Sequence, residues 1–125
     1  VGMPPVKQEL FQRINAYRQQ NGLQPLSYNP QLDQAAQAHN DFQAQAGMSH
    51  TGAGNSSPSQ RISAAGYQWR RTGENVAQGQ RSAAEVLQDW INSPGHNRNL
   101  LDPSVTEIGI GVGNNTWTMN TATPA

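Results

Sequence analysis

The sequence predicts an α+β domain, because helical signals fill most of the chain and the clearest strand signals lie near its end. Apolar residues recur at helical spacing in four stretches before residue 92, whereas clear alternation with period two begins after residue 107. A chain of 125 residues can bury one substantial hydrophobic core. We therefore expect a single domain over 1–125, with short tails at 1–5 and 122–125.

Most of the predicted helices begin at a residue that can cap them or end at a residue that interrupts them. Asn29-Pro30 and Ser57-Pro58 mark two starts, and a capping box of Ser82 with Glu85 marks another. Glycines at 22, 47 and 66 provide the stops of the first three helices, since they tolerate the left-handed backbone found there, and Asp102-Pro103 ends the last turn. The predicted helices span residues 5–20, 30–47, 58–66 and 82–91, and a last short turn covers 93–101.

The strand signals predict a C-terminal β-hairpin. Apolar residues alternate with glycines from Ile108 to Val112, a Gly-Asn-Asn turn follows, and Trp117 and Met119 continue the period of two over 116–121. A third strand is expected between residues 67 and 77. Because Gly109 and Gly111 would weaken an ordinary strand, we interpret them as positions where a helix packs closely against the sheet.

The composition excludes several classes of function. Eight basic residues balance eight acidic ones, so the chain lacks the excess positive charge of nucleic-acid or anionic-membrane binders. The absence of cysteine excludes disulfides, thiolate metal sites and a cysteine nucleophile. No apolar run approaches the roughly 20 residues of a membrane span. The first residues lack the features of a signal peptide, so we expect any such peptide to have been removed.

Three stretches each place one metal-competent or proton-active side chain among turn residues. They are Met48-Ser49-His50-Thr51-Gly52, Gly73-Glu74-Asn75-Val76-Ala77 and Ser93-Pro94-Gly95-His96. In the third, Ser93 suits an N-cap and Pro94 the first helical position, which puts His96 in the opening turn of a helix. The positive end of the helix dipole disfavours a protonated imidazole there, so His96 is expected to stay neutral. By composition and spacing alone, however, a shared site is the less favoured interpretation, because isolated polar residues near turns are usually capped or solvated.

Taken together, these motifs resemble the CAP superfamily, also called SCP/TAPS, which includes cysteine-rich secretory proteins, antigen 5 and pathogenesis-related proteins. The resemblance rests on GLQPLSYNPQLDQAAQAHNDF, MSH, GENVA, Trp90 followed by INSPGHNRNLL, and the EIGIGV strand, in that order, and covers roughly residues 6–121. Without cysteines, the chain resembles the short bacterial branch of the family. The resemblance implies a three-layer α-β-α sandwich with a small antiparallel sheet between helices.

The resemblance also implies a cleft in which two histidines and acidic residues meet. By motif, His50 and His96 correspond to the two family histidines, which bind a divalent metal in some members, and Glu74 to the glutamate of the GEN stretch. We therefore expect a divalent metal, with Zn²⁺ as the first candidate, on His50 and His96. Many eukaryotic members carry a second glutamate where this chain has Ser93, so the acidic set is incomplete.

Three functions follow from this interpretation. The first is a secreted or cell-envelope binding domain, expected to be monomeric, that recognises an extracellular ligand or protein through the histidine cleft. The second is a metal-dependent hydrolase in which Glu74 is the general base, and the sequence leaves open whether the protein is an enzyme. The third is lipid or sterol capture. His39 is expected to be a core-edge residue, and Trp69 to be a packing residue or one at the edge of the cleft.

Overall fold

The computed structural model describes residues 3–125, and its central element is a four-stranded sheet with the strand order β1-β3-β4-β2. The strands are β1 (Ser27–Tyr28), β2 (Trp69–Gln78), β3 (Glu107–Gly113) and β4 (Thr116–Pro124). The central strand β4 pairs in antiparallel fashion with β2 on one side and with β3 on the other, as expected. The short β1, which the sequence did not predict, pairs with β3 in parallel.

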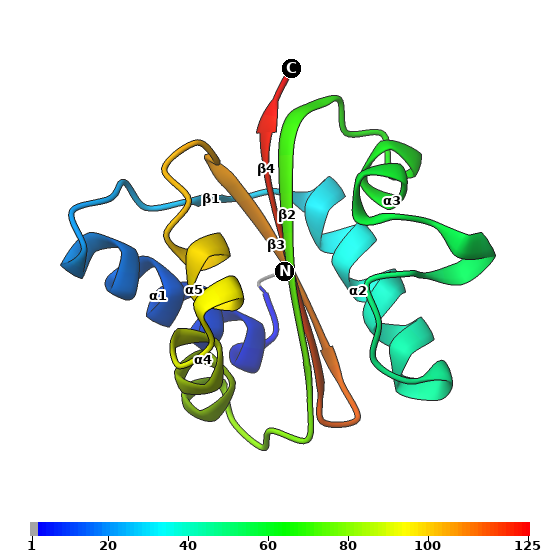
Figure 1. Ribbon diagram of the computed structural model, residues 1–125, viewed down its shortest axis with the longest axis horizontal. Coiled ribbons are helices and arrows are strands. Elements are labelled where there is room, and N and C mark those ends of the chain that lie inside the picture. The colour runs from blue at the N-terminus through cyan, green and yellow to red at the C-terminus, as the bar shows by residue number, and fades with distance from the viewer. Residues whose placement is uncertain (1–2) are drawn as a thin grey trace.

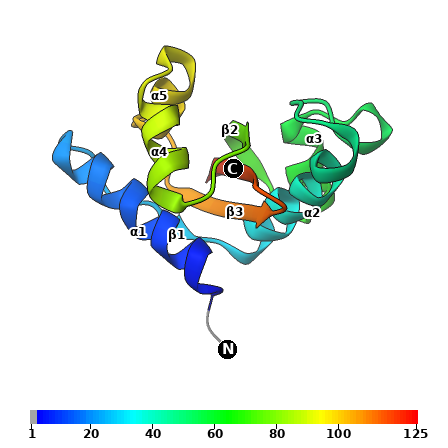
Figure 2. The ribbon, with the colours of Figure 1, turned by 90° about the horizontal axis from the view of Figure 1, so that it is seen from below.

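Helices cover both faces of this sheet and produce three layers. On one face lie α1 (Pro5–Gln20), α4 (Ala83–Ile91) and α5 (Pro94–Leu100), and on the other lie α2 (Pro30–Ala46) and α3 (Pro58–Ala64) (Figures 1 and 2). A short 3-10 helix, η1 (Ala53–Asn55), interrupts the loop between α2 and α3. This arrangement confirms the predicted α-β-α sandwich. Among residues 3–125, no helix combines the length and the apolar character needed to cross a bilayer.

The predicted helix signals work largely as expected. Asn29 accepts hydrogen bonds from the backbone N–H groups of Gln31 and Leu32, and Ser57 forms a capping box with Gln60. Ser82 caps α4 by accepting from the Glu85 N–H, but the Glu85 carboxylate accepts from the Arg81 N–H. The expected box at α4 is therefore only half formed.

The two glycines of β3 permit a close approach of α2 to the sheet, as predicted. A Cβ placed on Gly109 would lie 2.1 Å from the backbone carbon of Leu32, and one on Gly111 would lie 2.3 Å from the Ala36 oxygen. A side chain at either position would collide with helix backbone, which cannot move aside as a flexible side chain can. These glycines therefore set the distance between α2 and the sheet.

The predicted C-terminal tail is wrong, because β4 continues to Pro124. Ala122 and Thr123 are buried, and they pair with Thr72 and Arg71 of β2. The Ala125 N–H also donates to the Gln68 carbonyl. At the other end, α1 begins at Pro5, and residues 1–2 lie outside the part that the structure describes. Strand pairing with β2 supplied the order at the C-terminus that local composition did not indicate.

The hydrophobic core is divided unequally between the two faces of the sheet. The larger cluster lies on the α1, α4 and α5 side and includes Leu10, Ile14, Trp90 and Ile110. The smaller one involves α2 and α3 and consists of Leu32, Ala35, Ile62, Tyr67 and Ala122. The α2 and α3 side also contains buried polar groups, and it is there that Glu74 lies.

Candidate functional site

Glu74 lies on the edge strand β2, and hydrogen bonds occupy both of its carboxylate oxygens. Arg61 of α3 donates from Nη1 to Oε2 at 2.7 Å and from Nη2 to Oε1 at 3.3 Å. Asn120, directly opposite on β4, donates to Oε2 at 2.9 Å. His50 Nδ1 lies 3.0 Å from Oε1. With a side chain only 2% exposed, the carboxylate is buried, paired and fully hydrogen-bonded, as a buried charge requires.

The contact with Glu74 determines how His50 presents its ring. Because an ionised carboxylate only accepts hydrogen bonds, His50 must donate from Nδ1, which leaves Nε2 with a free lone pair in the neutral ring. The His50 side chain is 56% exposed, so Nε2 is open to solvent. Arg61 Nη2 also donates to the His50 carbonyl at 2.7 Å, which holds the loop around it. A carboxylate behind a histidine in this way orients many metal-binding imidazoles.

The side chains of neighbouring residues on β2 make contacts on opposite faces of the sheet. Glu74 contacts α3 and Asn120, whereas the next residue, Asn75, donates from Nδ2 to the His96 carbonyl on α5 at 3.0 Å. Asn99, also on α5, donates to the Glu74 carbonyl and to Asn75 Oδ1. Alternation along the strand thus directs the Glu74 side chain away from α5 while backbone and amide contacts hold α5 against β2.

His96 lies in the first turn of α5, as predicted, but Ser93 has a different role. Ser93 occupies the N-cap position without a side-chain cap hydrogen bond. Its hydroxyl instead lies 3.0 Å from His96 Nδ1. The pKa of His96 is lowered, mainly by burial and further by the repulsion between two protonated rings, His96 and His50. The predicted neutral imidazole is therefore supported, although burial rather than the helix dipole is the principal cause.

His39 borders the same network from α2, which the sequence interpretation did not anticipate. Its side chain is fully buried, and Nε2 donates to the Ser49 carbonyl at 2.7 Å. Nε2 also lies 3.9 Å from Glu74 Oε1. Burial lowers the pKa of His39 despite the opposing effect of Glu74, so the ring is neutral and Nδ1 is unprotonated. Within residues 3–125, that Nδ1 has no hydrogen-bond partner.

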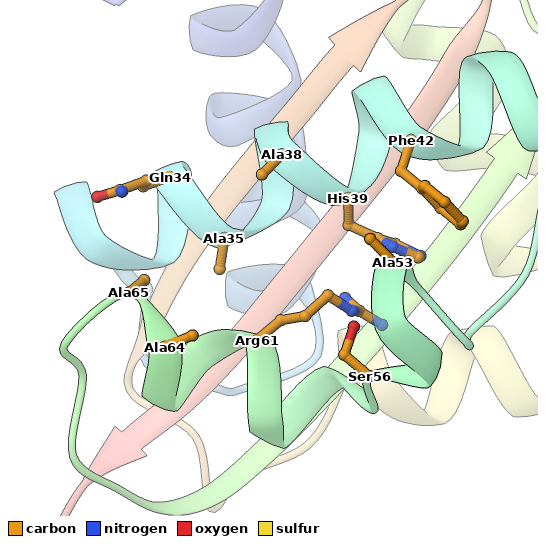
Figure 3. A pocket seen from close by; sticks show the side chains of 10 residues that line it. All are labelled: Gln34, Ala35, Ala38, His39, Phe42, Ala53, Ser56, Arg61, Ala64 and Ala65. Carbon is orange, nitrogen blue, oxygen red and sulfur yellow. The ribbon is translucent and has the colours of Figure 1, made fainter.

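Behind the network, a small pocket of about 320 Å³ lies between α2, η1 and α3. Figure 3 shows the alanines of α2 and α3 along one part of it, and His39, Arg61 and Ser56 together at the other. A Cβ on Gly52 would lie within 2.9 Å of Arg61 Nε, His39 Nδ1 and Ser56 Oγ. The absence of a side chain at Gly52 therefore allows the loop to close over these polar atoms.

The structure brings His50 and Glu74 into contact and places His96 within electrostatic reach of His50. Within the described part of the chain, however, no group of three or more histidine, cysteine or acidic side chains is arranged to hold a metal ion. The sequence interpretation missed Arg61, the strongest partner of Glu74. No local motif indicates it; the only signal is that a buried glutamate requires a cation, and the chain has seven arginines.

The sequence is similar to those of a known protein family. The model of the cysteine-rich secretory protein family, CAP, matches residues 11–121. The Bacillus subtilis protein YkwD is 34% identical over 106 residues, which cover 84% of this chain and 41% of YkwD. The B. subtilis membrane protein YlbC is 25% identical over 115 residues, covering 91% of this chain and 33% of YlbC. The chain thus spans less than half the length of these curated relatives.

Solved structures show the same fold. An extracellular SCP-domain protein from Bacillus anthracis superimposes with a TM-score of 0.90 at 25% identity, covering 98% of this chain and 44% of that one. An outer surface protein from Borrelia burgdorferi gives a TM-score of 0.90 at 21% identity, covering 100% of this chain and 97% of that one. Because the family model matches residues 11–121, which are most of the chain, this chain belongs to the cysteine-rich secretory protein (CAP) family.

Proposed function

We propose that this protein is a non-catalytic CAP domain of the extracellular or cell-envelope type, which binds its partner at the surface that carries His50 and His96, here called the histidine surface. The observation that carries this proposal is the engagement of Glu74. Four side-chain donors occupy its two oxygens, and its strongest contact is a paired hydrogen bond with the Arg61 guanidinium. A general base needs a free lone pair directed at its proton, so this arrangement favours a structural and positioning role over hydrolysis.

A divalent metal fits the histidine surface only in part. The Nε2 lone pair of His50 is free to bind a metal. The serine hydroxyl of Ser93 can accept a hydrogen bond from His96 Nδ1, and in that tautomer the Nε2 lone pair of His96 is free as well. The chain therefore offers two nitrogen donors, with Glu74 and Ser93 as the groups that orient them. Glu74 itself does not fit as a ligand because Arg61 occupies it. Structural zinc sites use four protein ligands and catalytic sites three, so a metal held by two histidines would keep positions for ligands from a binding partner.

Titration calorimetry with Zn²⁺ tests the metal component of the proposal. We expect weak binding of one ion, which is abolished in the double variant His50→Ala with His96→Ala. Asp89→Asn, which alters an exposed carboxylate of α4, serves as the control and should bind as the wild type does. Equal Zn²⁺ binding by the wild type and the double-histidine variant would contradict the assignment of these two residues.

The hydrolase alternative is tested separately. Metal-loaded wild type and Glu74→Gln are compared on peptide, ester and phosphodiester panels, after circular dichroism has shown that both are folded. We expect no turnover above background from either protein. Turnover by the wild type that disappears in folded Glu74→Gln would overturn the non-catalytic proposal and establish Glu74 as the base.

A further inference from the structure

A larger pocket, of about 630 Å³, lies apart from the histidine surface. It is formed by the first residues of β2 and by the segment that runs from the end of α5 into the following loop. Figure 1 shows both segments at the end of the sheet where the C-terminus lies. Neither His50 nor His96 lines this pocket. The pocket is therefore a separate surface that the proposed function does not use.

Two consecutive arginines of β2 line this pocket because the strand is irregular there. Successive residues of a regular strand point to opposite faces, which would separate Arg70 from Arg71. The pairing of β2 with β4 shifts register between Trp69 and Arg71, so that Arg70 has no partner residue on β4. Extra residues of this kind redirect side chains and are frequent beside binding sites. Both arginines consequently line one pocket.

The charge of this pocket contrasts with that of the chain as a whole. The net formal charge of the protein is zero, yet three of its seven arginines, Arg70, Arg71 and Arg98, line this one surface. Arg71 Nε lies 3.5 Å from Asp102 Oδ2. Arg70 and Arg98 are exposed and make no ion pair within residues 3–125. One carboxylate therefore opposes three guanidinium groups, and two positive charges remain available to a ligand.

An aromatic side chain lies on the same surface. Trp69 is 37% exposed and, with Met48, is one of the two large hydrophobic side chains exposed among the described residues. Its Nε1 donates to Ser63 Oγ at 2.8 Å, which holds the indole in place. The other two tryptophans, Trp90 and Trp117, are buried in the core, so exposure of an indole is particular to this pocket. A fixed, partly exposed indole provides an apolar face for a ring.

We propose that this pocket binds an anionic saccharide, a sugar that carries at least two phosphate or carboxylate groups. Arg70 and Arg98 bind the negative groups through charge-assisted hydrogen bonds, and Trp69 packs against the sugar ring. An extended nucleic acid suits the surface less well, because the basic residues are confined to one pocket on a neutral protein. Sugars that carry phosphate and sugars that carry carboxylate both present negatively charged oxygens beside a ring, and these features define the ligand class.

Nitrogen-15 NMR tests this proposal with the intact chain in low-salt buffer, where charge contacts are strongest. The probes are glucose 1,6-bisphosphate for the phosphate source and trigalacturonate for the carboxylate source. Maltotriose, inorganic phosphate and a thymidine oligonucleotide are the comparisons. The indole N–H signal of Trp69, assigned from a Trp69→Phe variant, reports binding. We expect saturable shifts with at least one anionic sugar, and the stronger of the two identifies the source.

Matched variants test which arginines bind the negative groups of the sugar. We expect Arg70→Gln and Arg98→Gln each to weaken binding about tenfold, because a charge-assisted hydrogen bond is lost. Arg81→Gln removes an equal charge from an exposed site before α4 and should change the affinity less than about twofold. Trp69→Ala, followed by calorimetry, should weaken binding about fivefold.

Four outcomes would overturn the proposal. They are the absence of saturable binding by both anionic sugars, an equal loss in Arg81→Gln, equally tight binding of maltotriose or inorganic phosphate, and tighter binding of the oligonucleotide. Because the histidine surface is not involved, none of these results bears on Zn²⁺ binding by His50 and His96.

Discussion

Replacing Glu74 by glutamine tests whether the buried ion pair with Arg61 holds this part of the fold together. Glutamine preserves the shape of the side chain but removes its charge and replaces one acceptor oxygen with a donor amide. The Glu74 side chain is 2% exposed and that of Arg61 is 11% exposed, so water cannot readily replace the lost partner. Removing one member of a buried pair leaves the other charge uncompensated, which typically costs about 3–5 kcal/mol.

We expect Glu74→Gln to lower the free energy of unfolding by about 3 kcal/mol, the lower end of that range, because Arg61 Nη2 keeps its bond to the His50 carbonyl. For a domain of this size that corresponds to a fall in Tm of about 10 °C. Circular dichroism during thermal and urea unfolding measures both quantities. Asp89→Asn removes an exposed carboxylate and should change stability by less than about 0.5 kcal/mol.

A double-mutant cycle separates the pair from its surroundings. When Glu74→Gln is combined with Arg61→Met, no unpaired guanidinium remains, so the combined loss should be smaller than the sum of the single losses by at least about 1 kcal/mol. A Tm for Glu74→Gln equal to that of the wild type, or strictly additive effects in the cycle, would refute the argument that this ion pair organises the site.

Three other predictions concern packing, ring orientation and pH. Gly109→Ala places a Cβ 2.1 Å from the backbone carbon of Leu32 and should reduce the free energy of unfolding by more than about 3 kcal/mol or prevent soluble expression. In the control Gly113→Ala, the new Cβ lies 3.8 Å from its nearest atom, so the loss should be under about 1 kcal/mol. Similar Tm values for the two variants would contradict the packing argument. Ser93→Ala should reduce Zn²⁺ affinity about tenfold in calorimetry with little change in Tm, because the Ser93 hydroxyl orients His96 and does not cap α5. A large loss of Tm with unchanged Zn²⁺ affinity would show that Ser93 stabilises the helix and does not orient His96. The pKa values of His39 and His96 are lowered chiefly by burial, so the unfolded chain binds protons more readily once the pH falls below the ordinary histidine pKa of 6.5. Thermal unfolding should therefore show Tm falling from about pH 7 to pH 5, with a shallower slope in His96→Asn, and an unchanged slope in that variant would exclude His96 as a contributor.

Local signals predicted most of the elements, because they act over a few residues. Asn29-Pro30 and Ser57-Pro58 start α2 and α3 where expected, and glycines with positive φ follow α2 and α3 at Gly47 and Gly66. The close approach at Gly109 was also predicted, since repeated glycines in a strand often mark a place where another backbone packs closely against it. The short β1 and the last residues of β4 were missed because strand pairing with distant segments maintains them.

By itself, the sequence determined the sandwich class, the family motifs, the loop position of His50 and the place of His96 in the first turn of a helix. The expected position of Glu74 among turn residues was wrong, because Glu74 lies within β2. Only the tertiary structure decided what these side chains do. Alternation along β2 turns Glu74 toward Arg61 of α3 and Asn75 toward α5. Glu74 is therefore the ion-pair partner of Arg61 and holds His50 in place. Among residues 3–125, no group of three metal-binding side chains forms with His96. The physical reason is that a buried carboxylate must be compensated by a cation, and which cation reaches it depends on how the helices pack across the sheet.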